Sequence, residues 1–211
     1  MITIDKKYIL EYIKDKLNSY KIKEINFKEE TYHHNSSYKN GTSIIKNGLL
    51  SLNELNKKGI ISLRKEELNL LNDHYSHVNG IYGISLSKVG LTDLYRDEEE
   101  YNPFRNDVID IIISNEVKAP RSSIHYGNEF IADSIIENKY FKSIDIRLFD
   151  FIENIKYEKD KLKLIENYNY LLDIAKTIKE EKLNISIREM SNTNLTLDID
   201  KLSKEGKIKI K

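Results

Sequence analysis

The sequence predicts an α+β domain, because helix-like and strand-like patterns occupy different parts of the chain. Apolar residues recur at helical spacing over residues 5–19 and 157–182, which indicates two amphipathic helices. Between them, residues 81–148 contain short isoleucine-rich runs bounded by turn residues, which is typical of strands. With no repeat and only two prolines, we expect residues 1–150 to form the main domain and residues 151–211 to pack against it as one compact unit.

Four helical regions are expected, at 5–19, 42–46, within 50–79 (one or two short helices) and 157–182. Gly48 is well placed to end the second of these helices, because glycine adopts the backbone conformation that closes a helix. In the third region Ser62 is a candidate N-cap, and Asn79-Gly80 predicts a turn.

Strands are expected at 30–35, 81–86, 107–113, 130–136 and 144–148, with two further alternating stretches at 195–199 and 207–211. The stretch 107–113 predicts a fully buried strand because β-branched side chains crowd along it. The stretch 144–148 alternates between apolar and charged residues.

Composition excludes several classes of function. The 34 basic and 34 acidic residues balance to a net charge of +0, which does not favour a large nucleic-acid footprint. The chain has no cysteine, so disulfides, thiolate nucleophiles and cysteine-ligated zinc are excluded. No apolar run approaches the ~20 residues that span a bilayer, and the N-terminus has no signal-like apolar segment. We therefore expect a cytoplasmic protein without a membrane partner.

Three segments carry side chains suited to chemistry, and they follow one another along the chain. The first is Tyr32-His33-His34-Asn35-Ser36-Ser37, which runs into the helix ended by Gly48. The second is Gly80-Ile81-Tyr82, followed by Ser85-Leu86-Ser87-Lys88. The third is Asn128-Glu129-Phe130-Ile131, which places a carboxylate at the start of a predicted strand.

The order and context of these segments resemble the ADP-ribosyltransferases with a His-Tyr-Glu site, a group that includes the poly(ADP-ribose) polymerase catalytic domains. From His34 to Gly48 the chain lines up without gaps on the family pattern of His-Gly-Thr/Ser-Ser, Asn, Ser-Ile and a helix ended by Gly-Leu. The resemblance covers about residues 30–150. It implies a split, mixed β-sheet core with peripheral helices, and NAD as the co-substrate.

The resemblance assigns His34 to a ribose hydroxyl of NAD, which suits a ring that donates from one nitrogen and accepts at the other. It assigns Asn35 and Ser36 to the same cofactor region, although Asn35 stands where the family has glycine. His33 is the competing candidate if the register slips by one residue. The two histidines do not predict a metal site, because adjacent strand residues point to opposite faces. We expect no metal.

The resemblance also implies that Tyr82 stacks on the nicotinamide ring, since a cationic pyridinium is attracted to a phenol face. Tyr95 is a second stacking candidate, and its spacing from Tyr82 is longer than in the family. Ser85 and Ser87 are assigned to cofactor binding. The segment Ser85-Leu86-Ser87 is also similar to the Ser-Thr-Ser strand of the Arg-Ser-Glu transferases, but those need an arginine where this chain has His34.

Glu129 is the expected catalytic residue. Breaking the N-glycosidic bond of NAD builds an oxocarbenium-like ribose cation, and a carboxylate on the 2′-hydroxyl stabilises that developing charge. The loop before it, 117–127, carries Lys118, Arg121 and several hydroxyl groups that suit a phosphate-bearing acceptor. Gly127 offers no side chain two residues before Glu129, where the arginine-specific transferases carry an activating Glu or Gln.

The sequence thus favours a mono-ADP-ribosyltransferase of bacterial toxin, effector or defence type, which modifies a macromolecule (DNA, RNA or protein), with nucleic acid ranked above protein. An antitoxin or immunity protein is an expected partner. Two alternatives remain open. One is a catalytically inactive module that binds NAD or ADP-ribose. The other is an RNA 2′-phosphotransferase, which shares the histidine-to-helix opening but uses more arginines than this chain supplies.

Overall fold

The computed structural model describes residues 6–24, 31–64, 82–88, 108–121, 129–153, 155, 157–191 and 195–205. Two sheets are formed by these residues, from the strands β1 (Lys21–Glu24), β2 (Thr31–Ser37), β3 (Leu49–Leu50), β4 (Ile84–Ser87), β5 (Val108–Ser114), β6 (Glu129–Ala132), β7 (Ile135–Ile136), β8 (Phe141–Ile146), β9 (Ser186–Glu189) and β10 (Leu195–Leu197). The helices are α1 (Lys6–Ser19), α2 (Tyr38–Asn47), α3 (Leu52–Lys57), the short 3₁₀ helix η2 (Asn138–Tyr140), α6 (Leu148–Glu153), α7 (Glu158–Glu180) and α8 (Ile199–Glu205).

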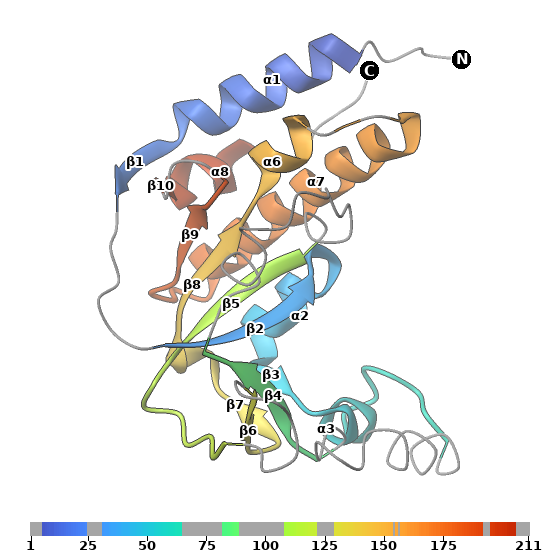
Figure 1. The fold of residues 1–211 in the computed structure, drawn as a ribbon, viewed down its shortest axis with the longest axis vertical. Coiled ribbons are helices and arrows are strands. Elements are labelled where there is room, and N and C mark those ends of the chain that lie inside the picture. Colours follow the sequence, from blue (N-terminus) through green and yellow to red (C-terminus); the bar gives the residue numbers. More distant parts are fainter. Residues whose placement is uncertain are drawn as a thin grey trace.

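Eight of these strands form one mixed sheet in the order β1-β10-β9-β8-β5-β2-β4-β6, with helices packed against it (Figure 1). Neighbouring strands are antiparallel except β8 and β9, which run parallel and are joined through α6 and α7. The remaining two, β3 and β7, pair separately. The predicted α+β class, with a mixed sheet and peripheral helices, is confirmed.

Helices α2 and α7 cover the sheet beside β2 and β5 because their apolar sides meet there. Tyr38 and Ile45 of α2 are buried, and Ile174 of α7 is fully buried. A Cβ atom on Gly41 would lie 2.2 Å from the Ile174 side chain, so glycine permits this close helix contact. Helix α2 begins at Tyr38, four residues before the predicted start, because tertiary packing overrides the weak helix propensity of its asparagine and glycine.

The predicted end of that helix is confirmed. Gly48 has φ 77°, and its N–H donates to the Ile44 carbonyl at 2.8 Å. Glycine adopts such a positive φ without the steric cost that a side chain would bring. The next helix, α3, begins after Ser51, whose hydroxyl accepts from the Glu54 N–H at 3.3 Å. The predicted N-cap Ser62 lies outside any helix of the described residues, and residues 65–81 are not described.

Both ends of the described chain join the same part of the sheet. Strand β1 pairs with β10, and the Asp198 N–H donates to the Tyr20 carbonyl at 2.8 Å. Lys16 of α1 forms an ion pair with Glu205 of α8 at 3.2 Å. The expected helices at 5–19 and 157–182 are confirmed as α1 and α7. The sequence did not predict strands β1 and β9. Strand β1 joins the N-terminal segment to the sheet, and β9 joins the C-terminal segment to it.

Three predicted boundaries are wrong. The stretch 130–136 is two strands, β6 and β7, because the chain turns at Ser134, whose carbonyl accepts from the Ser51 N–H at 2.8 Å. Strand β8 ends at Ile146, and Leu148 starts α6 instead of finishing the strand. Residues 195–199 do not form one strand, because Ile199 already belongs to α8. The predicted stretch 207–211 lies outside the described residues.

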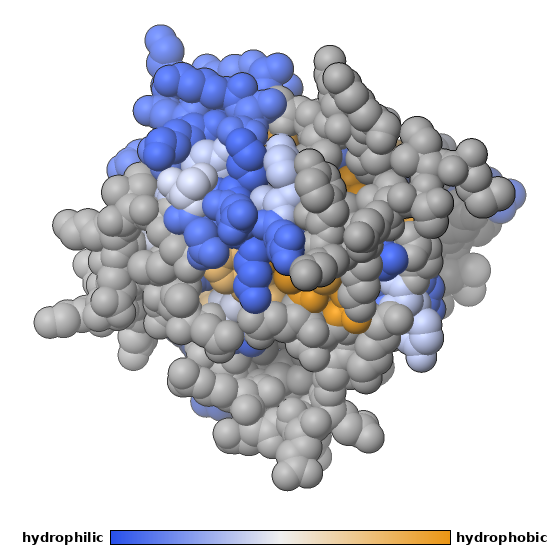
Figure 2. Space-filling model, turned by 90° about the horizontal axis from the view of Figure 1, so that it is seen from above, coloured by the Kyte–Doolittle hydropathy of each residue, from blue (hydrophilic) through white to orange (hydrophobic). Residues whose placement is uncertain are grey.

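Two large apolar side chains of the C-terminal segment are exposed. Leu162, one of the apolar residues that recur at helical spacing over 157–182, is 57% exposed, and Tyr157, which precedes α7, is 64% exposed. Seen from above, the described part of the surface is largely hydrophilic, with hydrophobic side chains visible in a limited area (Figure 2). Among the described residues, no helix is long and apolar enough to cross a membrane.

Candidate active site

Three adjacent strands bring the three chemistry-bearing segments together. Strand β2 carries the two histidines, β4 carries the two serines, and β6 begins with Glu129. His33 lies directly opposite Ser87, and Ser87 lies directly opposite Glu129. Segments separated by about a hundred residues in the chain therefore meet at one end of the sheet.

Ser85 connects two of the predicted site residues. Its hydroxyl donates to Glu129 Oε1 at 2.6 Å, and its backbone carbonyl contacts His34 Nδ1 at 3.0 Å. The short hydroxyl–carboxylate distance is typical of a charge-assisted hydrogen bond. A single residue of the central strand thus orients both the carboxylate and the imidazole. The assignment of Ser85 to cofactor binding stays a prediction, and the structure adds its hydrogen bond to Glu129.

His34 is held in a defined protonation state. Burial lowers the pKa of its imidazole, with the Ser85 carbonyl and the charge of Asp110 acting in the opposite direction. A carbonyl oxygen only accepts hydrogen bonds, so the proton of the neutral ring belongs on Nδ1 and the lone pair on Nε2. His34 can therefore accept a hydrogen bond from a ligand hydroxyl at Nε2.

His33 is oriented the other way. Its Nδ1 contacts Asp110 Oδ2 at 2.9 Å, and Asp110 belongs to β5, on the opposite side of β2 from β4. The two adjacent rings thus lean toward different neighbouring strands: His33 toward β5 and His34 toward β4. The His34 ring contacts the backbone of Ser85, the residue whose hydroxyl is bonded to Glu129, whereas the register places the His33 side chain on the same face of the sheet as Glu129.

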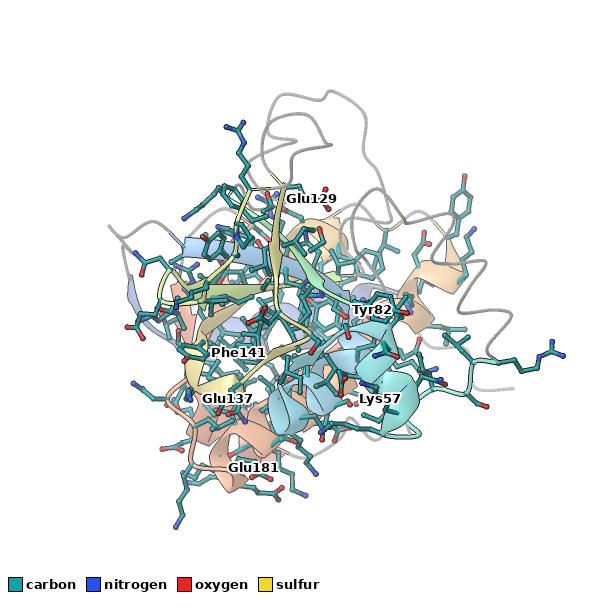
Figure 3. The ribbon with its side chains drawn as sticks, turned by 90° about the horizontal axis from the view of Figure 1, so that it is seen from below. Lys57, Tyr82, Glu129, Glu137, Phe141 and Glu181 are labelled. Carbon is teal, nitrogen blue, oxygen red and sulfur yellow. The ribbon has the colours of Figure 1, made fainter. Side chains whose placement is uncertain are left out.

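The other predicted site residues lie around this core. Tyr82 precedes β4 and is 58% exposed, and Figure 3 labels it together with Glu129 at the start of β6. The Ser36 hydroxyl accepts from the Asn40 side-chain amide at 3.2 Å. Asn35 lies directly opposite Asp110, and its Oδ1 atom is buried without a hydrogen-bond partner among the described residues. Tyr95 lies outside the described residues.

The cationic side chains expected near the acceptor begin beside β6. Lys118 and Arg121 are both exposed. Arg121 forms an isolated bridge with Phe130, and the Ile131 N–H donates to the Pro120 carbonyl at 3.0 Å. This segment therefore runs along the outer edge of the strand that carries Glu129. Residues 122–127, the rest of the expected acceptor loop, lie outside the described residues.

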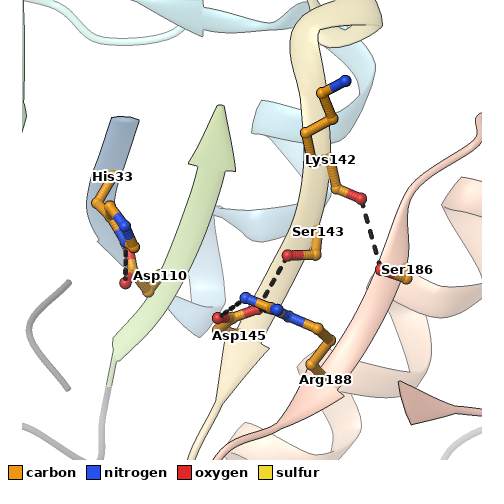
Figure 4. Close-up of polar contacts among 7 residues, drawn as sticks. All are labelled: His33, Asp110, Lys142, Ser143, Asp145, Ser186 and Arg188. Atoms are coloured by element: carbon orange, nitrogen blue, oxygen red, sulfur yellow. Dashed lines mark hydrogen bonds and ion pairs between the residues drawn. The ribbon is translucent and has the colours of Figure 1, made fainter. Parts of the chain in front are cut away.

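A buried polar row next to the site was not foreseen from the sequence. Asp110, Asp145 and Arg188 lie on β5, β8 and β9, and Figure 4 shows them with His33 and Ser143. Burial raises the pKa of Asp145 to about 6, while its hydrogen bonds and ion pair with Arg188 act to lower it. A signal was present in the sequence: a single aspartate within the isoleucine-rich run 108–113 is rarely buried without a partner.

Nothing in the described residues forms a cluster of three or more side chains suited to hold a metal ion. The chemistry available there is that of a carboxylate, a neutral imidazole, hydroxyl groups and an exposed phenol ring. No protein-family model, curated protein or solved structure matches the chain.

Proposed function

We propose that the protein is an NAD-dependent mono-ADP-ribosyltransferase that transfers ADP-ribose to a macromolecule. The observation that carries the proposal is the pair of contacts made by Ser85, which link His34 and Glu129 at one end of the sheet. These are two of the three residues that the resemblance names. The third, Tyr82, leads into the same strand as Ser85 and presents an exposed ring.

Each group has a defined task in this reaction. The Glu129 carboxylate binds the 2′-hydroxyl of the nicotinamide ribose and stabilises positive charge as it develops on the sugar. His34 Nε2 accepts a hydrogen bond from a ribose hydroxyl, and the Tyr82 ring stacks on the nicotinamide. The bond between ribose C1′ and the nicotinamide nitrogen breaks, and nicotinamide leaves with the electron pair. The acceptor's nucleophilic atom then bonds to C1′ and releases its proton to solvent.

The acceptor is proposed to be nucleic acid rather than protein, because Lys118 and Arg121 are exposed beside the Glu129 strand. Cationic side chains at this place can dock a backbone phosphate. Balanced net charge limits the strength of that attraction. We expect one ADP-ribose per site rather than a polymer, and an acceptor other than an arginine side chain.

The test uses purified protein with labelled NAD, alone and with a cell lysate. We expect nicotinamide to be released, and we expect the lysate to contain labelled macromolecules. Nuclease should remove this label, and protease should not. The matched control is Glu129→Gln, which keeps the size of the side chain and removes its charge; turnover should fall by more than about 100-fold with NAD affinity nearly unchanged. If Glu129→Gln keeps more than about a tenth of wild-type nicotinamide release, Glu129 is not the catalytic residue. An ADP-ribose ladder, or modification confined to arginine, contradicts the acceptor assignment.

A second candidate is a module that binds NAD or ADP-ribose without turning it over. Asn35 favours it, because this side chain stands where the family pattern has glycine and its Oδ1 atom is buried without a hydrogen-bond partner among the described residues. The same assay separates the two functions. A binding module is stabilised by NAD against heat but releases no nicotinamide.

A further inference from the structure

A row of ionisable side chains crosses four strands of the sheet and ends next to the candidate active site. His33 on β2 contacts Asp110 on β5 at 2.9 Å. Asp110 lies directly opposite Asp145 on β8, which lies directly opposite Arg188 on β9. Arg188 Nε donates to Asp145 Oδ1 at 2.6 Å, and its Nη2 atom donates to Oδ2 (Figure 4). The row therefore connects the C-terminal segment to the strand that carries the histidines.

The row is buried, so its charges depend on one another. Asp110 and Asp145 are each 4% exposed, and Arg188 is 8% exposed. Two carboxylates at directly opposite positions repel each other, and a buried charge without a partner is costly. The guanidinium of Arg188 compensates this repulsion at Asp145. Arg188 therefore balances the charge of the carboxylate that lies directly opposite Asp110.

The first member of the row is adjacent to a candidate catalytic residue. Successive side chains of a strand point in opposite directions, so fixing one ring also fixes the direction of the next. Asp110 holds the His33 side chain on one face of β2, and the His34 ring lies on the other face, where it contacts the Ser85 carbonyl of β4. A shift of β2 by one residue would exchange the faces on which the two rings lie. A specific buried partner such as Asp110 opposes this change of register.

We propose that Asp110 is a positioning residue of the active site, acting through His33 to orient His34, and that the ion pair of Arg188 with Asp145 supports Asp110 from the neighbouring strand. This inference rests on the proposed NAD site. It gives the C-terminal segment a role in the chemistry, because β9 supplies the cation that the row needs. Asp110 touches no substrate in this scheme.

The first test measures NAD affinity in the Glu129→Gln background, in which turnover is slow. Asp110→Asn should weaken NAD binding by about tenfold, which corresponds to the loss of one well-oriented hydrogen bond. When His34 is already alanine, the same change should alter affinity by less than about twofold, because its effect is transmitted through that ring. Equal losses in both backgrounds would overturn the proposal. The matched control is Glu189→Gln, an equally buried carboxyl on β9 that contacts the Leu148 N–H instead of the row; it should leave NAD affinity unchanged.

The second test addresses Arg188. Arg188→Met leaves Asp145 buried without its cation, and we expect weaker NAD binding and a lower melting temperature. Combining it with Asp145→Leu removes the whole ion pair, an exchange that proteins often tolerate. The double variant should recover affinity to within about threefold of wild type. A folded double variant that binds as poorly as a protein lacking His34 contradicts the role given to Arg188. The double variant also decides this point if the single variant does not fold.

A third measurement separates failure of this inference from failure of the proposed function. The imidazole resonances of His33 and His34 are followed by NMR without any ligand. Asp110→Asn should shift both ring signals, and Glu189→Gln should shift neither. If wild-type protein does not bind NAD, the proposed function fails, and the NMR result still decides whether Asp110 orients the second ring. An unchanged His34 signal in Asp110→Asn overturns the inference.

Discussion

Replacing Ser85 with alanine removes one atom from the centre of the candidate site. The lost hydroxyl donates to Glu129 Oε1 at 2.6 Å, while the backbone carbonyl that contacts His34 Nδ1 is retained. The change therefore separates the orientation of the carboxylate from the orientation of the imidazole. We expect the reaction to slow while NAD binding is preserved.

The magnitude follows from the kind of hydrogen bond. A bond to a charged group contributes about 1.5–3 kcal/mol. Ser85 is exposed, so water can replace part of the interaction, and a value at or below the lower end of that range, about 1–1.5 kcal/mol, applies. This corresponds to a fall in kcat of roughly 5- to 12-fold. The KM for NAD should stay within about twofold of wild type, because the contact that orients His34 is unaffected.

The assay is nicotinamide release at saturating and limiting NAD. Ser85→Thr restores a hydroxyl on a residue suited to a strand, and it should recover most of the lost rate. In the Glu129→Gln background, Ser85→Ala should cost less than about twofold, since its partner has already lost its charge. A kcat within about twofold of wild type for Ser85→Ala, or a KM that rises as much as kcat falls, refutes the reasoning.

Four further predictions concern binding and stability. His34→Ala should weaken NAD binding more than His33→Ala, measured by calorimetry, and the reverse order would move the cofactor contact to His33. NAD affinity should also fall as pH drops below the ordinary histidine range near about 6.5, because burial lowers the His34 pKa and binding uses the neutral ring. Gly41→Ala should lower the free energy of unfolding by about 1–2 kcal/mol, because overpacking against α7 outweighs the gain in helix propensity. An unchanged denaturation midpoint would show that the two helices can separate without cost. Burial raises the pKa of Glu189 from 4.5 to about 7, so its protonated form stabilises the fold below pH 4.5 and this contribution is lost as pH rises through 7. The stability of wild type relative to Glu189→Gln should therefore fall by about 3 kcal/mol across that window, and a pH-independent difference would exclude the shift.

Local sequence patterns were enough to locate several helices and strands of this protein. Helical spacing of apolar residues located α1 and α7, and Gly48 marked the end of α2 because the required φ is one that glycine adopts without strain. The isoleucine-rich run located β5. The candidate site residues were also named from the sequence, since His34, Ser85 and Glu129 each stand in a recognisable context. These features depend on interactions within a few residues, which a sequence displays directly.

Tertiary structure decided which of these residues meet. The hydrogen bond between Ser85 and Glu129 could not be read from the sequence, because only the pairing of β4 with β6 brings the two side chains together. Asp110 lay unnoticed in an apolar run until pairing of β5 with β2 supplied His33 as its partner. Strand β9 received no prediction because its charged residues obscure the pattern, and Arg188 is buried only through the aspartate on β8. Partners of this kind are separated by tens of residues in the chain, and only the order and register of the strands determine which side chains become neighbours.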